Sequence, residues 1–323
     1  MRAWQAFEVG EPAAVCKLGE VEVPTPAAGQ ILVRVRAAAL NFPDVLMCRG
    51  QYQVRPPFPF TPGVELCGTV ASAGVFAPGT RVIGSPVLPH GALAEFAVMD
   101  AASAFVAPES MDDVAASGLF IAYQTGWFGL HRRAHLRAGE TLLVHAAAGG
   151  VGSAAVQLGK AAGARVIAVV GGAAKAEVAR SLSADLVIDR KTEDFVAVVK
   201  EYTGGRGADV IYDPVGGDAY AGSTKCIAFE GRILVIGFAS GSIPAPGLNH
   251  ALIKNYSIVG LHWGLYQKHD PASIYAAHQE LTALADSGAV RPLVGAQLDL
   301  EHAMDGLTQL GAGDTVGRVV VVP

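Results

Sequence analysis

A glycine-rich turn gives the chain a way to bind phosphate groups. The turn lies between an apolar run at residues 141–144 and a helical pattern at 153–160, and its spacing is Ala147-x-Gly149-x-x-Gly152. Glycines in such a turn let backbone N–H groups approach a pyrophosphate at the positive end of a helix. The spacing matches the dinucleotide fingerprint G-x-G-x-x-G, except that alanine replaces the first glycine. The alternative is a tight turn inside an apolar α/β core. On the dinucleotide interpretation, the contacts are Ala148, Gly149, Gly150, Val151 and Gly152.

A second apolar run, residues 164–170, indicates which dinucleotide is bound. NAD-specific sites place a carboxylate at the end of this strand to hold the ribose 2′-OH, but Gly171 and Gly172 stand there instead. Glycine leaves room for a 2′-phosphate, and the nearby cations Lys175 and Arg190 can pair with it. The alternative is that both cations are ordinary surface charges. The pattern favours NADPH over NADH as the cofactor.

The composition is typical of a globular enzyme. Of 323 residues, 51% are hydrophobic and only 16% charged, which argues against disorder. The net charge of −5 and the lack of a basic cluster indicate no nucleic-acid partner. The chain starts without an apolar signal core, and glycines and charges interrupt every apolar stretch, so we expect no membrane association. Four scattered cysteines suit reduced thiols in the cytoplasm.

The pattern of apolar runs and predicted secondary structure changes twice along the chain. Short Val- and Ile-rich runs broken by Pro and Gly, such as residues 30–37 and 68–74, predict antiparallel strands up to about residue 108. From about residue 115 to 260, helices alternate with apolar strands, which is typical of a doubly wound parallel sheet. The simplest α/β arrangement is a Rossmann domain at 121–260, inserted between the two parts of a β-rich domain at 1–120 and 261–323.

Several separated motifs then occur in a familiar order. They are Asn41-Phe42-Pro43-Asp44, Arg49-Gly50-Gln51-Tyr52, Pro62-Gly63-Val64-Glu65 and the glycine turn. With these motifs the chain resembles the medium-chain dehydrogenase/reductase superfamily over essentially its whole length, and within it the zinc-free, zeta-crystallin-like NADPH:quinone oxidoreductase branch. The resemblance implies a GroES-like catalytic domain formed by both ends of the chain, a Rossmann NADP-binding domain between them, and a homodimer.

Two positions depart from the zinc-dependent alcohol dehydrogenases of that superfamily. Asn41 stands where those relatives have a cysteine ligand, and Val64 where they have a histidine ligand. Valine cannot ligate zinc and asparagine is a poor substitute for thiolate, so we expect no metal. Without a Lewis acid, hydride transfer needs an acceptor that is already electron-poor, such as a quinone or an α,β-unsaturated carbonyl.

The resemblance also implies which residues contact the acceptor and the rest of the cofactor. Asn41 and Tyr52 match positions that flank the nicotinamide and the substrate, so we expect both to be catalytic. Asn41 could instead be a turn residue, and Tyr52 an aromatic residue that only shapes the pocket. The remaining expected cofactor contacts are Asn41 itself, Thr125, Gly237, Phe238, Leu261 and Trp263.

Three functions are compatible with these residues. The first is an NADPH:quinone reductase, which the resemblance favours. The second is an NADPH-dependent reductase of an enone or enoyl-thioester C=C bond; for a CoA substrate, Arg49 and Arg55 are the candidate basic contacts. The third is an NADPH-binding structural or sensory protein with little turnover.

Overall fold

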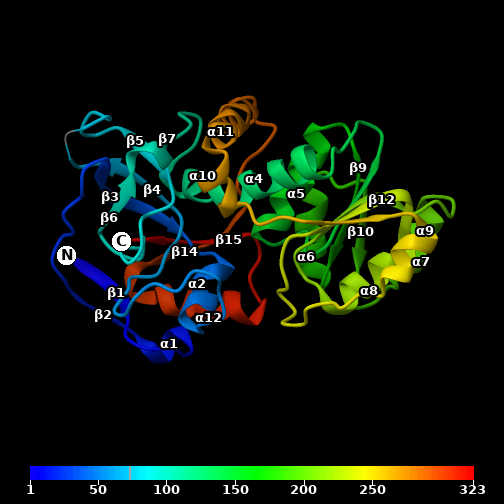
Figure 1. The fold of residues 1–323 in the computed structure, drawn as a ribbon, viewed down its shortest axis with the longest axis horizontal. Helices are drawn as coiled ribbons and strands as arrows, with labels where there is room; N and C mark the ends of the chain where they lie inside the picture. Colours follow the sequence, from blue (N-terminus) through cyan, green and yellow to red (C-terminus); the bar gives the residue numbers. More distant parts are fainter. Residues whose placement is uncertain (73) are drawn as a thin grey trace. The chain divides into compact units, whose positions relative to one another are not determined.

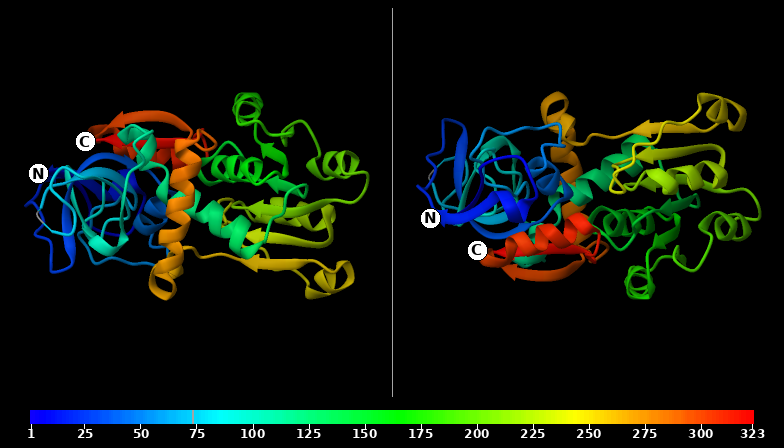
Figure 2. Two further views of the ribbon diagram at one scale, coloured as in Figure 1. Left: turned by 90° about the horizontal axis from the view of Figure 1, so that it is seen from above. Right: turned by 90° about the horizontal axis from the view of Figure 1, so that it is seen from below.

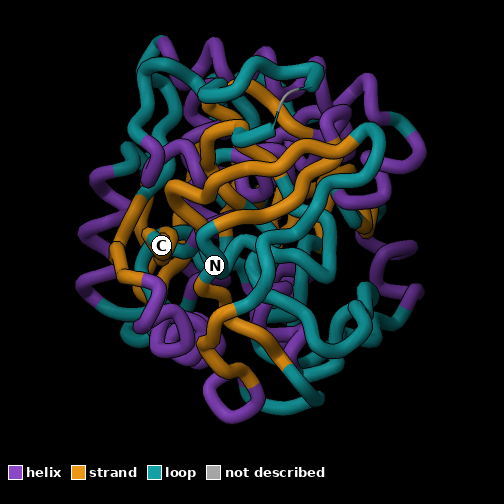
Figure 3. Tube along the Cα trace, turned by 90° about the vertical axis from the view of Figure 1, so that its left-hand side faces the viewer, coloured by secondary structure: helices purple, strands orange, loops and turns teal. Residues whose placement is uncertain are grey.

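The chain forms two compact units, each with its own sheet and its own core. The computed structural model describes residues 1–72 and 74–323. One unit consists of Met1–Ile121 with Arg291–Pro323, and the other of Ala122–Val290. Figure 1 shows the elements in the colours of the sequence, and Figure 3 marks both chain ends within the first unit.

The first unit is built around a sheet of seven strands. The strands of this sheet are β3 (Gln30–Ala39), β4 (Leu66–Val70), β5 (Arg81–Gly84), β6 (Phe96–Asp100), β7 (Ala104–Val106), β14 (Val294–Asp299) and β15 (Arg318–Val322), and the unit also contains β1 (Arg2–Ala6) and β2 (Cys16–Glu20). Its helices are α1 (Pro12–Val15), α2 (Phe42–Cys48), α3 (Asp113–Ser117) and α12 (Ala303–Ala312), with 3-10 turns at Ala101–Ser103 and Leu300–His302. The sheet order is β14-β15-β3-β4-β5-β7, with β6 also on β3, and β1 and β2 form a separate pair.

Strand β3 shows why this sheet forms. Ile31, Val33 and Val35 are buried in the core, whereas Arg34 and Arg36 between them are exposed. This two-residue period places one face of the strand in the core and the other toward solvent. The terminal strand β15 then pairs antiparallel with β3, so the chain end completes the sheet that the first hundred residues began.

The second unit is a doubly wound parallel sheet. Its strands are β8 (Thr141–Val144), β9 (Arg165–Val170), β10 (Leu186–Asp189), β11 (Ala208–Asp213), β12 (Ile227–Val235) and β13 (Ser257–Gly260). Its helices are α5 (Gly150–Ala161), α6 (Ala173–Ser181), α7 (Phe195–Tyr202), α8 (Gly217–Cys226), α9 (Leu248–Lys254), α10 (Gly264–His269) and α11 (Pro271–Asp286); α4 (Phe120–Trp127) leads into it and continues as a π-helix, Phe128–Arg133.

The order of this sheet creates a switch point at the glycine turn. The strands lie side by side as β10-β9-β8-β11-β12-β13, as the face-on views in Figure 2 show. All residues of β8 and β11 are buried, because helices such as α5 and α8 lie on either side of the sheet. From β8 the chain runs outward to β10 and then returns to β11. Ligands of such sheets bind beyond the carboxyl ends of the strands where the order reverses.

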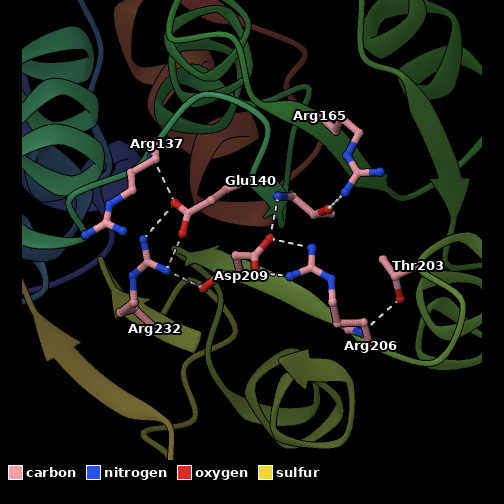
Figure 4. Close-up of polar contacts among 9 residues, drawn as sticks. Arg137, Glu140, Arg165, Thr203, Arg206, Asp209 and Arg232 are labelled. Atoms are coloured by element: carbon pink, nitrogen blue, oxygen red, sulfur yellow. Dashed lines mark hydrogen bonds and ion pairs between the residues drawn. The ribbon is translucent and has the colours of Figure 1, made fainter. Parts of the chain in front are cut away.

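An ion-pair network joins the amino ends of β8 and β11 to Arg232 of β12 (Figure 4). Glu140 pairs with Arg232 at 2.8 Å, and Asp209 accepts the Thr141 N–H at 2.7 Å while it binds Arg206. These residues lie at the edge of the sheet opposite to the carboxyl ends of the strands. We therefore assign them a role in stabilising the sheet and not in binding a ligand.

The structure corrects one expected domain boundary. The return of the chain to the β-rich domain was expected at residue 261, but the second unit extends to Val290. The reason is the packing of α11, since Gln124 donates to the Ile274 carbonyl at 3.1 Å and Trp127 donates to Glu280 at 2.8 Å. The strand expected at 68–74 ends at Val70 as β4, and Ala73 lies outside the described residues. Within residues 1–72 and 74–323, no helix is long and apolar enough to cross a membrane.

Candidate functional site

The glycine turn between β8 and α5 requires glycine at its third motif position. A Cβ on Gly152 would lie 2.2 Å from the carbonyl oxygen of Ala146, a distance no side chain tolerates. Gly152 therefore allows α5 to begin directly against the turn. Ala147 and Ala148 are buried, whereas Gly149, Gly150 and Val151 keep partial exposure. The exposed part of the turn thus includes Gly149 and Gly150, which present only backbone.

The first turn of α5 has open backbone donors. Gly149 is the N-cap, and among the described residues no side chain caps this helix end. The first turn also carries no acidic residue. Uncapped N–H groups and the positive end of the helix dipole favour an anion at this position. The turn therefore suits an anionic group, and its binding of the pyrophosphate of a dinucleotide stays a prediction.

Two cations lie against the glycines that follow β9. A Cβ on Gly171 would be 3.3 Å from Nη2 of Arg190, so the guanidinium group lies next to this glycine. A Cβ on Gly172 would be 3.6 Å from Nζ of Lys191. Gly172 has φ of +103°, a conformation that favours glycine. Sequence reasoning identified Arg190 but missed Lys191; its position directly after Arg190 was the available signal.

The carboxylate of Asp189, which lies near Gly172, accepts hydrogen bonds from backbone N–H groups. Asp189 accepts the N–H of Gly172 at 2.7 Å and the N–H of Lys191 at 3.0 Å. These two hydrogen bonds lower the pKa of Asp189, so it holds the two loops together in its charged form. Lys175 lies in the first turn of α6, which begins immediately after Gly172. The predicted cations therefore lie on segments that meet at Gly172.

In the first unit, Asn41 belongs to a buried polar network. Its amide nitrogen donates to the Ala39 carbonyl at 3.0 Å and to Glu65 at 2.9 Å, and its amide oxygen accepts from Arg318 at 3.0 Å. Arg318 also forms an ion pair with Glu65, whose side chain is fully buried. Both amide hydrogens of Asn41 are therefore used within the protein.

Two buried carboxyl groups hold the segments around Asn41 in place. Asp44 accepts the N–H of Asn41 at 2.8 Å and that of Gly63 at 3.0 Å, and burial raises the pKa of Asp44 to about 7. Glu65 accepts the N–H of Ile121 at 2.7 Å through its other oxygen. Burial raises the pKa of Glu65, while Arg318 acts in the opposite direction. Sequence reasoning missed Arg318, although its charge interrupts a terminal run of valines.

Tyr52 lies on the segment that follows α2, in the same unit as Asn41. Its ring is half-buried and packs against the core of the first unit. Burial raises the pKa of the Tyr52 hydroxyl, and the nearby charge of Asp44 adds to this. A neutral hydroxyl close to Asp44 can donate a hydrogen bond throughout the neutral pH range. Val64 is half-buried against the same core.

The other expected cofactor contacts all lie in the second unit. Thr125 is half-buried in α4, Gly237 and Phe238 follow β12, and Leu261 follows β13. Trp263 is buried at the start of α10. The segment 259–264 was expected to return to the catalytic domain, but it belongs to the second unit. Their approach to a cofactor stays a prediction.

Comparison with known proteins identifies the family. A family model described as "Alcohol dehydrogenase GroES-like domain" matches residues 27–109, and one described as "Zinc-binding dehydrogenase" matches residues 150–282. The "Quinone oxidoreductase-like protein 2 homolog" of Nematostella vectensis is 36% identical over 99% of this chain and 88% of its own length.

Solved structures agree with this family. A probable oxidoreductase from Mycobacterium abscessus matches with a TM-score of 0.91 and 36% identity, covering 100% of this chain and 99% of its own. The Escherichia coli quinone oxidoreductase, crystallised with NADPH, matches with a TM-score of 0.92 and 29% identity over 100% of both chains. The chain therefore belongs to the quinone oxidoreductase branch of the medium-chain dehydrogenase/reductase superfamily.

Proposed function

We propose that the protein is an NADPH-dependent oxidoreductase that transfers hydride to a quinone without zinc. The observation that carries this proposal is the combination of two features. One is the glycine turn at the start of α5, and the other is the pair of cations, Arg190 and Lys191, that lie against Gly171 and Gly172. The quinone oxidoreductase relatives, one of them crystallised with NADPH, support the same conclusion. When bound, NADPH supplies the hydride.

The residues of the second unit are proposed to hold the cofactor. The N–H groups of α5 bind the pyrophosphate, and Arg190, Lys191 and Lys175 neutralise the 2′-phosphate. Guanidinium and ammonium groups form charge-assisted hydrogen bonds that only the phosphorylated cofactor can accept. Thr125, Gly237, Phe238, Leu261 and Trp263 are proposed to contact the nicotinamide half.

The hydrogen bonds of Asn41 lead us to propose different roles for Asn41 and Tyr52. A quinone that accepts hydride develops negative charge on an oxygen, and a donor at that oxygen lowers the barrier. Asn41 donates its amide hydrogens to the Ala39 carbonyl and to Glu65. Asn41 is therefore proposed to position the chain segment between β3 and α2. The Tyr52 hydroxyl is then the proposed donor to the acceptor oxygen.

A kinetic screen tests this function against its alternatives. NADPH oxidation should be measured with quinones, with simple enones and with enoyl-CoA thioesters, and quinones should give the highest kcat/KM. A preference for enones or thioesters would replace the proposal with C=C reduction. Arg49 does not favour a CoA substrate, because Glu11 binds its guanidinium through two contacts of 2.9 Å. Tight NADPH binding with no turnover would indicate a structural or sensory role.

The metal content of the purified protein is a direct prediction. Because Asn41 and Val64 occupy the ligand positions, we expect no stoichiometric zinc and no effect of chelators on NADPH oxidation. Within the part of the chain that the structure describes, no three His, Cys, Asp or Glu side chains are grouped as metal ligands. Elemental analysis provides the measurement. About one zinc per chain, with activity lost on chelation, would contradict the proposed chemistry.

The Tyr52→Phe variant tests how much the hydroxyl contributes. With a quinone, water can protonate the stabilised oxyanion, so we expect kcat to fall by less than about a hundredfold. With an enone, the enolate needs a placed proton, and the loss should reach about 10²–10⁴-fold. The measurement is kcat for both acceptors at saturating NADPH. A larger loss with the quinone would make Tyr52 an obligatory acid.

A homodimer is also part of the proposal. The strand β13 ends the parallel sheet, and the neighbouring helix α9 exposes Leu248, Leu252 and Ile253, each about three-quarters accessible. An unpaired edge strand next to an apolar face is typical of a surface that a second chain covers. The double variant L252E/I253E should therefore sediment as a monomer. The control Val75→Glu, at an exposed valine of the first unit, should stay dimeric. A monomeric wild-type protein would contradict the prediction.

A further inference from the structure

Two buried cysteines from different elements touch in the first unit. Cys16 is the first residue of β2 and Cys48 is the last residue of α2. Their sulfur atoms are 3.9 Å apart, although the residues are separated by 32 positions in the chain. Cys48 is fully buried and Cys16 nearly so, and the proposed function uses neither of them.

Contacts on both sides hold this pair of sulfurs together. The N–H of Gly10 donates to the Cys48 carbonyl at 2.9 Å, which joins the segment before α1 to the end of α2. The next residues in each segment, Glu11 and Arg49, form a bidentate ion pair. These contacts hold the segments that carry the two thiols close together.

The contact makes the two thiols chemically unequal. The hydrogen bond between the two sulfurs, in which either atom can be the donor, lowers the pKa of Cys16. The same contact, burial and the charge of Asp44 raise the pKa of Cys48. The thiolate is the nucleophile, and an oxidant reaches Cys16 first because Cys16 is 6% exposed and Cys48 is 0% exposed.

We propose that Cys16 and Cys48 are a redox modification site that forms a reversible intrachain disulfide with hydrogen peroxide. The Cys16 thiolate attacks one peroxide oxygen, the O–O bond breaks, and the leaving hydroxide takes up a proton to give water. The sulfur of Cys48 then attacks the sulfenic acid sulfur of Cys16. An S–S bond forms, the S–O bond breaks, and the hydroxyl leaves as a second water with the proton of Cys48. Both thiols are oxidised and one peroxide is reduced to two waters.

The required movement is small. The sulfurs must approach from 3.9 Å to about 2.05 Å, the length of a disulfide bond. The bond would link β2 to the helix that carries Asp44 and begins directly after Asn41. Cross-linking two distant positions restricts the unfolded chain, so the oxidised protein should unfold at a higher temperature.

The other two cysteines provide internal controls. Cys67 contacts the Asp113 carboxylate at 3.6 Å, and burial raises the pKa of Cys67 to about 12. Burial likewise raises the pKa of Cys226 to about 12, and its thiol contacts the Ser223 carbonyl. Both thiols are expected to stay reduced under conditions that oxidise the pair.

Peptide mapping of the oxidised wild-type protein tests the proposal. The protein is treated with excess hydrogen peroxide, alkylated and digested without reductant. We expect two of the four thiols to disappear, the intact mass to fall by two hydrogen atoms, and one cross-linked peptide pair to join Cys16 to Cys48. Dithiothreitol should restore four thiols, and the Tm should rise by several degrees on oxidation. The variants Cys67→Ser and Cys226→Ser should keep the cross-link, whereas Cys16→Ser should lose it.

Three results would overturn the proposal. One is oxidation of Cys16 to sulfinic acid while Cys48 remains a free thiol. The second is preferential oxidation of Cys67 or Cys226. The third is a cross-link that joins two chains instead of two segments of one chain. Because these readouts need no turnover, they are independent of the proposed quinone reduction.

Discussion

Replacing Glu65 by alanine is expected to lower the free energy of unfolding of the first unit by about 3–5 kcal/mol. The substitution leaves the Arg318 guanidinium buried without its carboxylate. It also removes one of the two acceptors of the Asn41 amide and the side-chain acceptor of the Ile121 N–H. An uncompensated buried charge with unsatisfied donors around it costs far more than the contact itself contributes. Urea unfolding followed by fluorescence and circular dichroism measures the change.

An exposed ion pair provides the matched control. Glu177 and Arg180 pair on the surface of α6, and their side chains are 76% and 56% accessible. Glu177→Ala should change the free energy of unfolding by less than about 1 kcal/mol. The double variant E65L/R318L should recover much of the loss, because no lone charge then remains in the core. Equal effects of Glu65→Ala and Glu177→Ala would show that the Asn41 network is not strongly stabilising.

Removing the cations near Gly172 is expected to weaken NADPH binding much more than NADH binding. Arg190→Ala and Lys175→Ala each remove a group that can form a charge-assisted hydrogen bond, worth roughly 1.5–3 kcal/mol. We therefore expect a loss of tenfold or more in NADPH affinity for each substitution. Lys191→Ala should act in the same direction, since its ammonium group lies against Gly172. The affinities of both cofactors are measured by isothermal titration calorimetry.

The comparison of two arginines makes this test specific. Arg180 lies on α6 as Lys175 does, but it is largely exposed and pairs with Glu177. Arg180→Ala should leave the ratio of NADPH to NADH affinity unchanged. If Arg190→Ala weakens both cofactors equally, the guanidinium only supports the loop and the cofactor preference has another origin.

The sequence alone determined the features that depend on neighbouring residues. The glycine turn, the strand before it, and the helix and strand after it lie within about thirty residues. Gly152 had to be glycine because the backbone of the same turn approaches it. The parallel sheet was predicted equally well, since continuous apolar runs such as β8 and β11 are buried on both faces. Local chain geometry is sufficient for such predictions.

Only the tertiary structure decided which distant side chains meet. Arg318 is separated from Asn41 by 277 residues and from Glu65 by 253, and no sequence period connects them. They come together because β15 pairs with β3, whose last residue lies two positions before Asn41. The same holds for Cys16 and Cys48, which meet because the segment before α1 and the end of α2 share a backbone hydrogen bond and an ion pair. A strand pairing or a helix contact is a property of the whole fold, and this is why the sequence predicted Asn41 but not its partner Arg318.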